Sequence, residues 1–296
     1  MFEPEHPAYA RLQSIGKEIT QKVKPKAVVV FSAHWQAPGS SKIRVNTAES
    51  TNLVYDYHGF PDKYYQVKYP SVGSKKVGEK VLRLLEAAGI DCEGVTRGLD
   101  HGVFAPFICS MLQSPLYVEV TWCAHEEIVF NPEKNPLEVP LVQVSLFGGE
   151  DPNMHYALGK AVSQLRAEGV VIVCSGMAVH NIRYIVPFSL LASAHGANRN
   201  QSDLGLGRAT GRLLDYVEPF DKALKDAVVN VTSGDERKNK LAELLKRPDA
   251  RGAHPTFEHL LPIHIAAGAA GEDDAAQIWT MLEPSVSWAQ YRFSEI

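Results

Sequence analysis

The chain has 296 residues, of which 45% are hydrophobic and 22% charged, a composition typical of a globular protein with a sizeable core. A formal net charge of −4 and the lack of a basic stripe argue against nucleic acid as the main partner. The four cysteines are scattered without a CxxC pair, the N-terminus has no signal-peptide pattern, and no apolar run is long enough to span a bilayer. We therefore expect a cytoplasmic protein without disulfides or a membrane segment; the sequence indicates no oligomeric state.

The first predicted elements lead into a buried strand. Apolar residues at helical spacing between 8 and 22 predict a helix. The run AVVVFSAHW (27–35) follows, with the β-branched residues of a strand in a parallel sheet, and SKIRVNTA (41–48) predicts a second strand. The aromatic stretch YDYHGFPDKYYQVKYP (55–70) reads as an irregular loop, and loops of this kind often border functional sites.

Helices and strands then alternate along the chain. An amphipathic helix is predicted over 74–90, a strand-to-turn transition at Asp100–Gly102, and a buried strand over 139–147. A helix over 153–169 precedes a third buried strand, 170–181. The remaining predicted elements are helices over 206–230 and 236–250, a turn with an apolar helix over 254–271, and strands over 276–284 and 285–293. This alternation predicts one α/β domain over residues 1–296, with a mostly parallel central sheet flanked by helices.

Histidines fall where such a sheet places its ligands. His34 and His180 end two of the most apolar strands, and ligands bind beyond the carboxyl ends of strands in open α/β sheets. His101 precedes a glycine, and His259 lies at the start of the apolar helix. A single histidine in such a position is more often structural than a ligand, but together these residues predict a metal site at the carboxyl-end rim. Neutral imidazole suits iron, zinc, copper or nickel, and without an HExxH motif the spacing does not select among them.

Other motifs narrow the chemistry. His58 lies in the aromatic loop and is a candidate substrate contact, whereas His264 falls within the apolar helix and is expected in the core. The sequence contains no GxGxxG, no phosphate-binding GxxxxGK[ST] and no GxSxG, so neither nucleotide binding nor a serine nucleophile is supported.

Several motifs together resemble a known enzyme family. They are VVVFSAHW, YDYHGFPDKYYQVKYP, GLDHGVFAPF, VPLVQVSLF, GVVIVCSGMAVHNIR and HPTFEHLLPIHIAAGAAG. In this order they resemble the LigB-type (class III) extradiol ring-cleavage dioxygenases, in the branch similar to 4,5-DOPA extradiol dioxygenases. The resemblance implies a mononuclear non-haem Fe(II), with zinc held by some members. It also implies a catecholic, DOPA-like substrate that is opened with O₂ beside its two hydroxyls.

The resemblance also implies roles for individual residues. His34 in SAHW and His259 in FEHLLP would be metal ligands. His180 in AVHN matches the family's acid/base histidine, a task that suits imidazole near neutral pH. His101 in DHG matches a pocket histidine that contacts substrate or oxygen.

The sequence departs from the family pattern in three places. The family's first metal ligand is a His in an HG-x-P motif at the end of a first strand, and we expect that strand and ligand to be missing ahead of Met1. His58 or Glu258 would then be the substitute donor. Residues 108–128, and the stretch that follows AVHNIR, are expected to be insertions.

Two other function classes stay open from the residues alone. One is a zinc-holding hydrolase on a related scaffold, with Glu258 as general base for a metal-bound water. The other is a degenerate, non-catalytic relative that kept the fold as a binding protein. Oxygen consumption with a catechol separates both from the dioxygenase.

Overall fold

The structure is a computed structural model that describes residues 6–39, 41–60, 62–69, 71–111, 137–184 and 212–294. The expected insertion at 108–128 falls largely outside these residues, and only its first four residues are described, as the end of a helix. Most of the second expected insertion, after Arg183, also lies outside the described residues.

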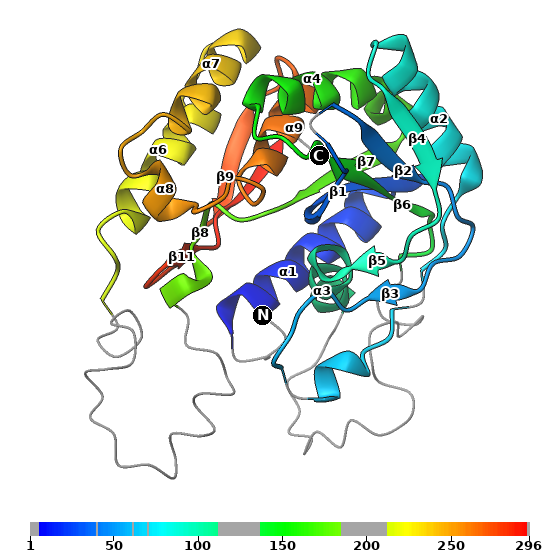
Figure 1. Ribbon diagram of the computed structural model, residues 1–296, viewed down its shortest axis with the longest axis horizontal. Helices are drawn as coiled ribbons and strands as arrows, with labels where there is room; N and C mark the ends of the chain where they lie inside the picture. Colours follow the sequence, from blue (N-terminus) through cyan, green and yellow to red (C-terminus); the bar gives the residue numbers. More distant parts are fainter. Residues whose placement is uncertain are drawn as a thin grey trace.

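A five-stranded sheet forms the centre of the protein (Figure 1). Its order is β4-β2-β6-β1-β7, and β1 pairs in parallel with both β6 and β7. The β2–β4 pair is also parallel, and β2 and β6 alone run antiparallel in this sheet. The mostly parallel sheet predicted from the sequence is thus confirmed. The strands are β1 (Ala27–Gln36), β2 (Ile43–Asn46), β4 (Cys92–Val95), β6 (Leu141–Leu146) and β7 (Val170–Ser175).

Strand β1 is buried on both faces because helices cover both sides of it. Val29 and Phe31 pack into the larger core with α4 and α9, whereas Val28 and Val30 pack on the other face against Phe104 of α3. This alternation is the two-residue period of an extended strand. Helix α1 lies along α3 below the sheet in Figure 1. The helices around the sheet are α1 (Pro7–Lys17), η1 (Glu18–Val23), α2 (Lys75–Ala87), α3 (His101–Met111), α4 (Pro152–Val162), η3 (Ser163–Glu168) and α9 (Leu261–Ala270).

The C-terminal third adds a group of helices and small antiparallel sheets at one side of the central sheet (Figure 1). Its elements are α6 (Val217–Val228), α7 (Gly234–Leu244), α8 (Ala250–Ala253), β9 (Ala275–Trp279), β10 (Leu282–Glu283), β11 (Val286–Ser287) and β12 (Gln290–Phe293). The remaining short elements are β3 (Leu53–Val54), η2 (Asp62–Tyr65), β5 (Leu99–Asp100), β8 (Val179–His180) and η4 (Ile182–Tyr184). Among all the helices described, none is both long and apolar enough to cross a bilayer.

Two local predictions were wrong, and both concern histidines. The strand expected to end near Asp100 is present as β5, but the start of α3 at His101 follows it in place of the expected turn. The backbone N–H of His101 donates to Asp56 Oδ1 at 3.0 Å. This satisfies one of the unpaired amides at the start of a helix. Because the acceptor lies 45 residues away, the local sequence does not reveal this cap.

The strand expected to run unbroken to His180 is divided in two. It leaves the central sheet after Ser175, and His180 belongs to β8, which pairs with β11 in a separate three-stranded sheet. At Gly176 an added Cβ would lie 2.3 Å from the carbonyl oxygen of His259. The break therefore brings the chain against the segment that carries His259, at a spacing that only glycine allows.

Candidate metal centre

Strand β1 brings His34 to the site within a polar network. The backbone N–H of His34 donates to Ser32 Oγ at 3.2 Å, and that hydroxyl donates to Asp100 Oδ1 at 2.7 Å. Asp100 is fully buried and also accepts hydrogen bonds from Gln143 and Arg97. Buried, hydrogen-bonded polar groups of this kind fix local geometry, so the end of β1 is held firmly from beneath.

Asp56 bridges His34 and His101. Its Oδ2 lies 3.2 Å from His34 Nδ1 and its Oδ1 lies 2.7 Å from His101 Nδ1. The two imidazole rings are in contact, with centroids 3.9 Å apart and a tilt of 52°. Burial raises the pKa of Asp56, but the hydrogen bonds from His101 and His34 outweigh it and hold that pKa well below its ordinary value. Asp56 is therefore ionised at neutral pH.

His259 and His180 extend the same group. The ring of His259 meets that of His34 edge-on at 4.9 Å and stacks on that of His180 at 3.5 Å, with only 20° between the planes. The order of contact is therefore His101, His34, His259 and His180. The structure thus brings together all four histidines predicted to form the site.

Burial keeps the inner histidines neutral. It lowers the pKa of His259 well below the ordinary value, and repulsion from His180 and His34 adds to the effect. Burial, with repulsion from His34 and His101, lowers the pKa of His180 to about 4. The buried Nδ1 of His259 has no hydrogen-bond partner among the residues described. The other buried histidines also keep one ring nitrogen unpartnered in the described part of the chain, so it is the contact of His259 with His34 and His180 that makes it a candidate metal ligand.

Gly102 allows α3 to begin directly against β1. A Cβ at this position would lie 2.4 Å from Ser32 Oγ and 2.8 Å from His34 Cδ2. The carbonyl oxygen of Gly102 accepts a hydrogen bond from Ser175 Oγ at the end of β7. The helix start is thus fixed between two strands, with no room for a side chain.

The aromatic loop forms a wall beside His101. The ring of Tyr57 meets the His101 ring edge-on at 5.2 Å, and its hydroxyl donates to the Tyr64 carbonyl. Tyr65 in turn donates to the Tyr57 carbonyl at 3.1 Å. Burial is the main cause that raises the pKa of Tyr57 to about 12. His58, the predicted substrate contact, is exposed on this loop and is not brought into the group of four histidines.

Two carboxylates border the histidines, and one of them, Glu258, was a candidate from the sequence. Glu258, between two histidines in sequence, lies with its carboxylate near His180 and His259, with potential ligand atoms within 4.8 Å of one another. Its Oε1 accepts a hydrogen bond from Thr256. Asp56 was not predicted, although it lies in the aromatic loop two residues before His58. Its role depends on a fold contact that a single sequence does not display.

The other buried histidines are structural. His254 Nε2 lies 2.9 Å from the carbonyl oxygen of Ala178, and His264 Nε2 lies 3.3 Å from that of Leu241. His264 is 1% exposed, which confirms its predicted place in the core. His155 is fully buried in α4, with Nδ1 2.7 Å from a backbone oxygen. The ring nitrogens of these side chains bond to backbone oxygens and do not belong to the candidate centre.

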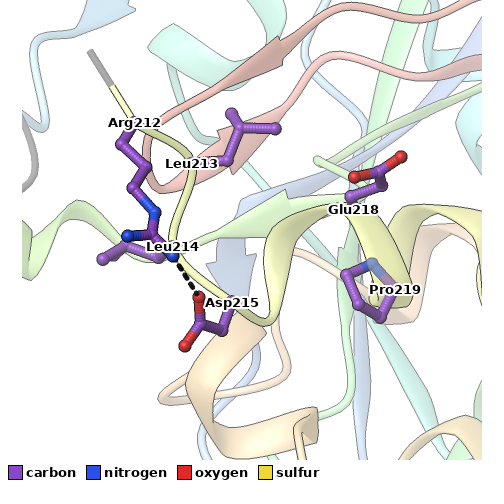
Figure 2. A pocket seen from close by; sticks show the side chains of 6 residues that line it. All are labelled: Arg212, Leu213, Leu214, Asp215, Glu218 and Pro219. Carbon is purple, nitrogen blue, oxygen red and sulfur yellow. Dashed lines mark ion pairs between the residues drawn. The ribbon is translucent and has the colours of Figure 1, made fainter.

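A separate surface hollow lies before α6 (Figure 2). Its volume is about 420 Å³ and it contains no histidine. The Arg212–Asp215 ion pair at its edge is highly exposed, with 81% and 97% of the two side chains accessible. It is an open depression and not part of the histidine centre. Its lining residues are Arg212, Leu213, Leu214, Asp215, Glu218 and Pro219.

Comparison with known proteins identifies the family. A model described as the catalytic LigB subunit of aromatic ring-opening dioxygenase matches residues 3–286. The chain belongs to the LigB family. The resemblance inferred from the sequence motifs is thus confirmed, and membership of the LigB family makes the chain an aromatic ring-cleaving dioxygenase by class.

Individual relatives agree with the LigB assignment. A 4,5-DOPA dioxygenase extradiol-like protein of Schizosaccharomyces pombe is 32% identical, over 88% of this chain and 73% of its own. A 4,5-DOPA dioxygenase extradiol of Beta vulgaris is 31% identical, over 94% and 85% of the two chains. The crystal structure of an uncharacterized protein of Escherichia coli K12 matches with a TM-score of 0.65 at 22% identity, over 97% and 92%. This last likeness supports the LigB fold.

Proposed function

We propose that the protein is a non-haem Fe(II)-dependent extradiol dioxygenase that opens the ring of a catecholic, DOPA-like substrate with O₂. The observation that carries the proposal is the continuous group of four histidines. Within this group His259 has a buried Nδ1 that is unpartnered among the described residues. Relatives named as 4,5-DOPA dioxygenases support the choice of substrate class. The cytoplasm is our proposal for its location.

The residues present fit a metal. His34 and His259 are the proposed ligands, because their rings are adjacent and burial favours the neutral form of His259. Glu258 is the proposed third donor, since it is the carboxylate grouped with His259, and two histidines with one carboxylate form a common donor set for Fe(II). Zinc is the alternative metal. Bound iron would supply sites for the catechol hydroxyls and for O₂, and would activate both.

Protein side chains would move the protons and orient the ring. A neutral His180 would accept a catechol hydroxyl proton at its unprotonated ring nitrogen and return it later. This is general acid–base catalysis. His101, on the opposite side of His34, would contact substrate or oxygen. Tyr57 would line the aromatic pocket, with His58 a substrate contact at its exposed edge.

The test is anaerobic loading with Fe(II), removal of excess metal, and addition of a catechol panel followed by O₂. We expect one O₂ to be consumed for each substrate, with a yellow semialdehyde product. Activity on ester or amide substrates without O₂ would instead favour a zinc-holding hydrolase with Glu258 as base. Iron-loaded protein that turns over neither class would contradict the dioxygenase and indicate a non-catalytic relative.

A further inference from the structure

We propose that Asp56 is a positioning residue that fixes the tautomers of His34 and His101, with Nδ1 protonated and Nε2 bare on both rings. The proposal deepens the proposed function and rests on it only for the role of His34 as a metal ligand. It assigns Asp56 the task of presenting the nitrogen that the metal needs.

The positions of the two carboxylate oxygens against the rings indicate the tautomers. An ionised carboxylate only accepts hydrogen bonds, so each nitrogen that faces it must carry the proton. Oδ2 faces His34 Nδ1 at 3.2 Å, and Oδ1 faces His101 Nδ1 at 2.7 Å. Because a neutral imidazole has a single N–H, the Nε2 atom of each ring is left with its lone pair.

Asp56 is better suited to this support than to direct ligation. Its two oxygens already face three N–H groups, including the backbone N–H of His101 at 3.0 Å. Metal-bound histidines commonly donate their second ring nitrogen to such a carboxylate, which orients the ring and raises its basicity. One carboxylate here serves both rings, so their 3.9 Å contact is set by a shared partner.

The loop around Asp56 is anchored on both sides. Tyr55 donates its hydroxyl to the carbonyl oxygen of Val67, and Tyr57 donates to that of Tyr64. The side chain of Asp56 is only 20% exposed. The carboxylate is therefore held between its neighbours before any metal arrives, which is the preorganisation a positioning residue requires.

The first test reads the tautomers directly in the metal-free wild-type protein. Long-range ¹H–¹⁵N spectra at about pH 8, where an ordinary imidazole is neutral, distinguish Nδ1–H from Nε2–H rings. We expect His34 and His101 both as Nδ1–H. An Nε2–H tautomer at His34 would overturn the proposal. The result depends neither on a variant that folds nor on activity.

The second test removes the charge at constant shape. In Asp56→Asn the amide NH₂ must face one of the two imidazoles, which then accepts at Nδ1 and carries its proton on Nε2. We expect cobalt(II), used as a stable probe for Fe(II), to bind about 10- to 100-fold more weakly. Asp62→Asn, an exposed change of the same charge in the same loop, should bind cobalt(II) like the wild type.

The ring-cleavage proposal and the proposed role of Asp56 can be contradicted independently of each other. If the tautomers and the cobalt affinity depend on Asp56 but no catechol is opened, the ring-cleavage proposal falls and the role of Asp56 stands. If catechols are opened while Asp56→Asn keeps wild-type tautomers and cobalt affinity, the role of Asp56 falls and the dioxygenase stands.

Discussion

Burial alone does not distinguish the proposed site histidines of this protein from the structural ones. The groups that each ring contacts distinguish them. His254 and His180 both lose basicity through burial, which lowers their pKa values to about 3 and about 4. His254 Nε2 is engaged by a backbone carbonyl, whereas His180 lies in the histidine group and stacks on His259. His180 is therefore the residue that we propose for proton transfer.

We expect His180→Gln to lower kcat by roughly 10²- to 10⁴-fold, the usual contribution of a general acid–base group. Cobalt(II) affinity should change less than about threefold, because a proton-transfer residue does not hold the metal. Steady-state oxygen uptake and metal titration measure the two quantities. His6→Gln, at the start of α1, is the control and should keep wild-type turnover. A parallel loss of metal affinity in His180→Gln would instead make His180 a ligand.

At the scale of elements, a buried arginine joins the ends of two helices. Arg237 of α7 is 4% exposed and donates to the carbonyl oxygens of Val228, Gly271 and Asp273, at 3.0, 3.0 and 2.8 Å. Val228 ends α6 and Gly271 caps α9. Carbonyls at helix C-termini lack partners within the helix and carry partial negative charge, so one guanidinium stabilises both ends.

Replacing this guanidinium should be costly. We expect Arg237→Met to lower the free energy of unfolding by about 2 to 4 kcal/mol, because it leaves buried carbonyls without donors. Lys246→Met, which removes an exposed ion pair with Glu243, should cost less than about 1 kcal/mol. Urea denaturation of both variants gives the comparison. Equal losses would show that Arg237 adds nothing beyond a surface charge.

Elements with strong local patterns were predictable from sequence, and those that depend on distant contacts were not. Residues 74–90 show helical periodicity and residues 27–35 a β-branched run, so α2 and β1 were correctly predicted. The start of α3 was missed because its cap comes from Asp56, and β8 was missed because the break at Gly176 responds to the His259 segment. Histidine positions indicated the candidate site, but the carboxylate that bridges two of them did not show in the sequence.

At the scale of the whole molecule, the layer of α4 and α9 over the central sheet encloses histidines that resist protonation. Burial lowers the pKa of His155, and burial lowers that of His264 to about 4. His264 Nε2 of α9 lies 3.3 Å from the carbonyl oxygen of Leu241 in α7, and His254 Nε2 lies 2.9 Å from that of Ala178 ahead of β8. Protonation of these buried imidazoles is therefore expected to weaken the folded state.

Stability should fall as the pH drops from about 7 to 4. The folded pKa of His264 lies below the unfolded value near 6.5, so the unfolded chain binds more protons in this window and the free energy of unfolding decreases. This residue alone accounts for at most roughly 3 kcal/mol. Urea denaturation across this range should show a shallower pH dependence for His264→Leu than for the wild type. Identical slopes would contradict the assignment.

The close approach at Gly102 affects how natural variants of this protein should be interpreted. Any side chain there would press on Ser32 and His34, so the damage would reach the candidate metal centre although residue 102 has no group that reacts. A survey of harmful substitutions would place this glycine among the proposed site histidines. Its importance is steric, because the missing side chain leaves room for His34 at the end of β1.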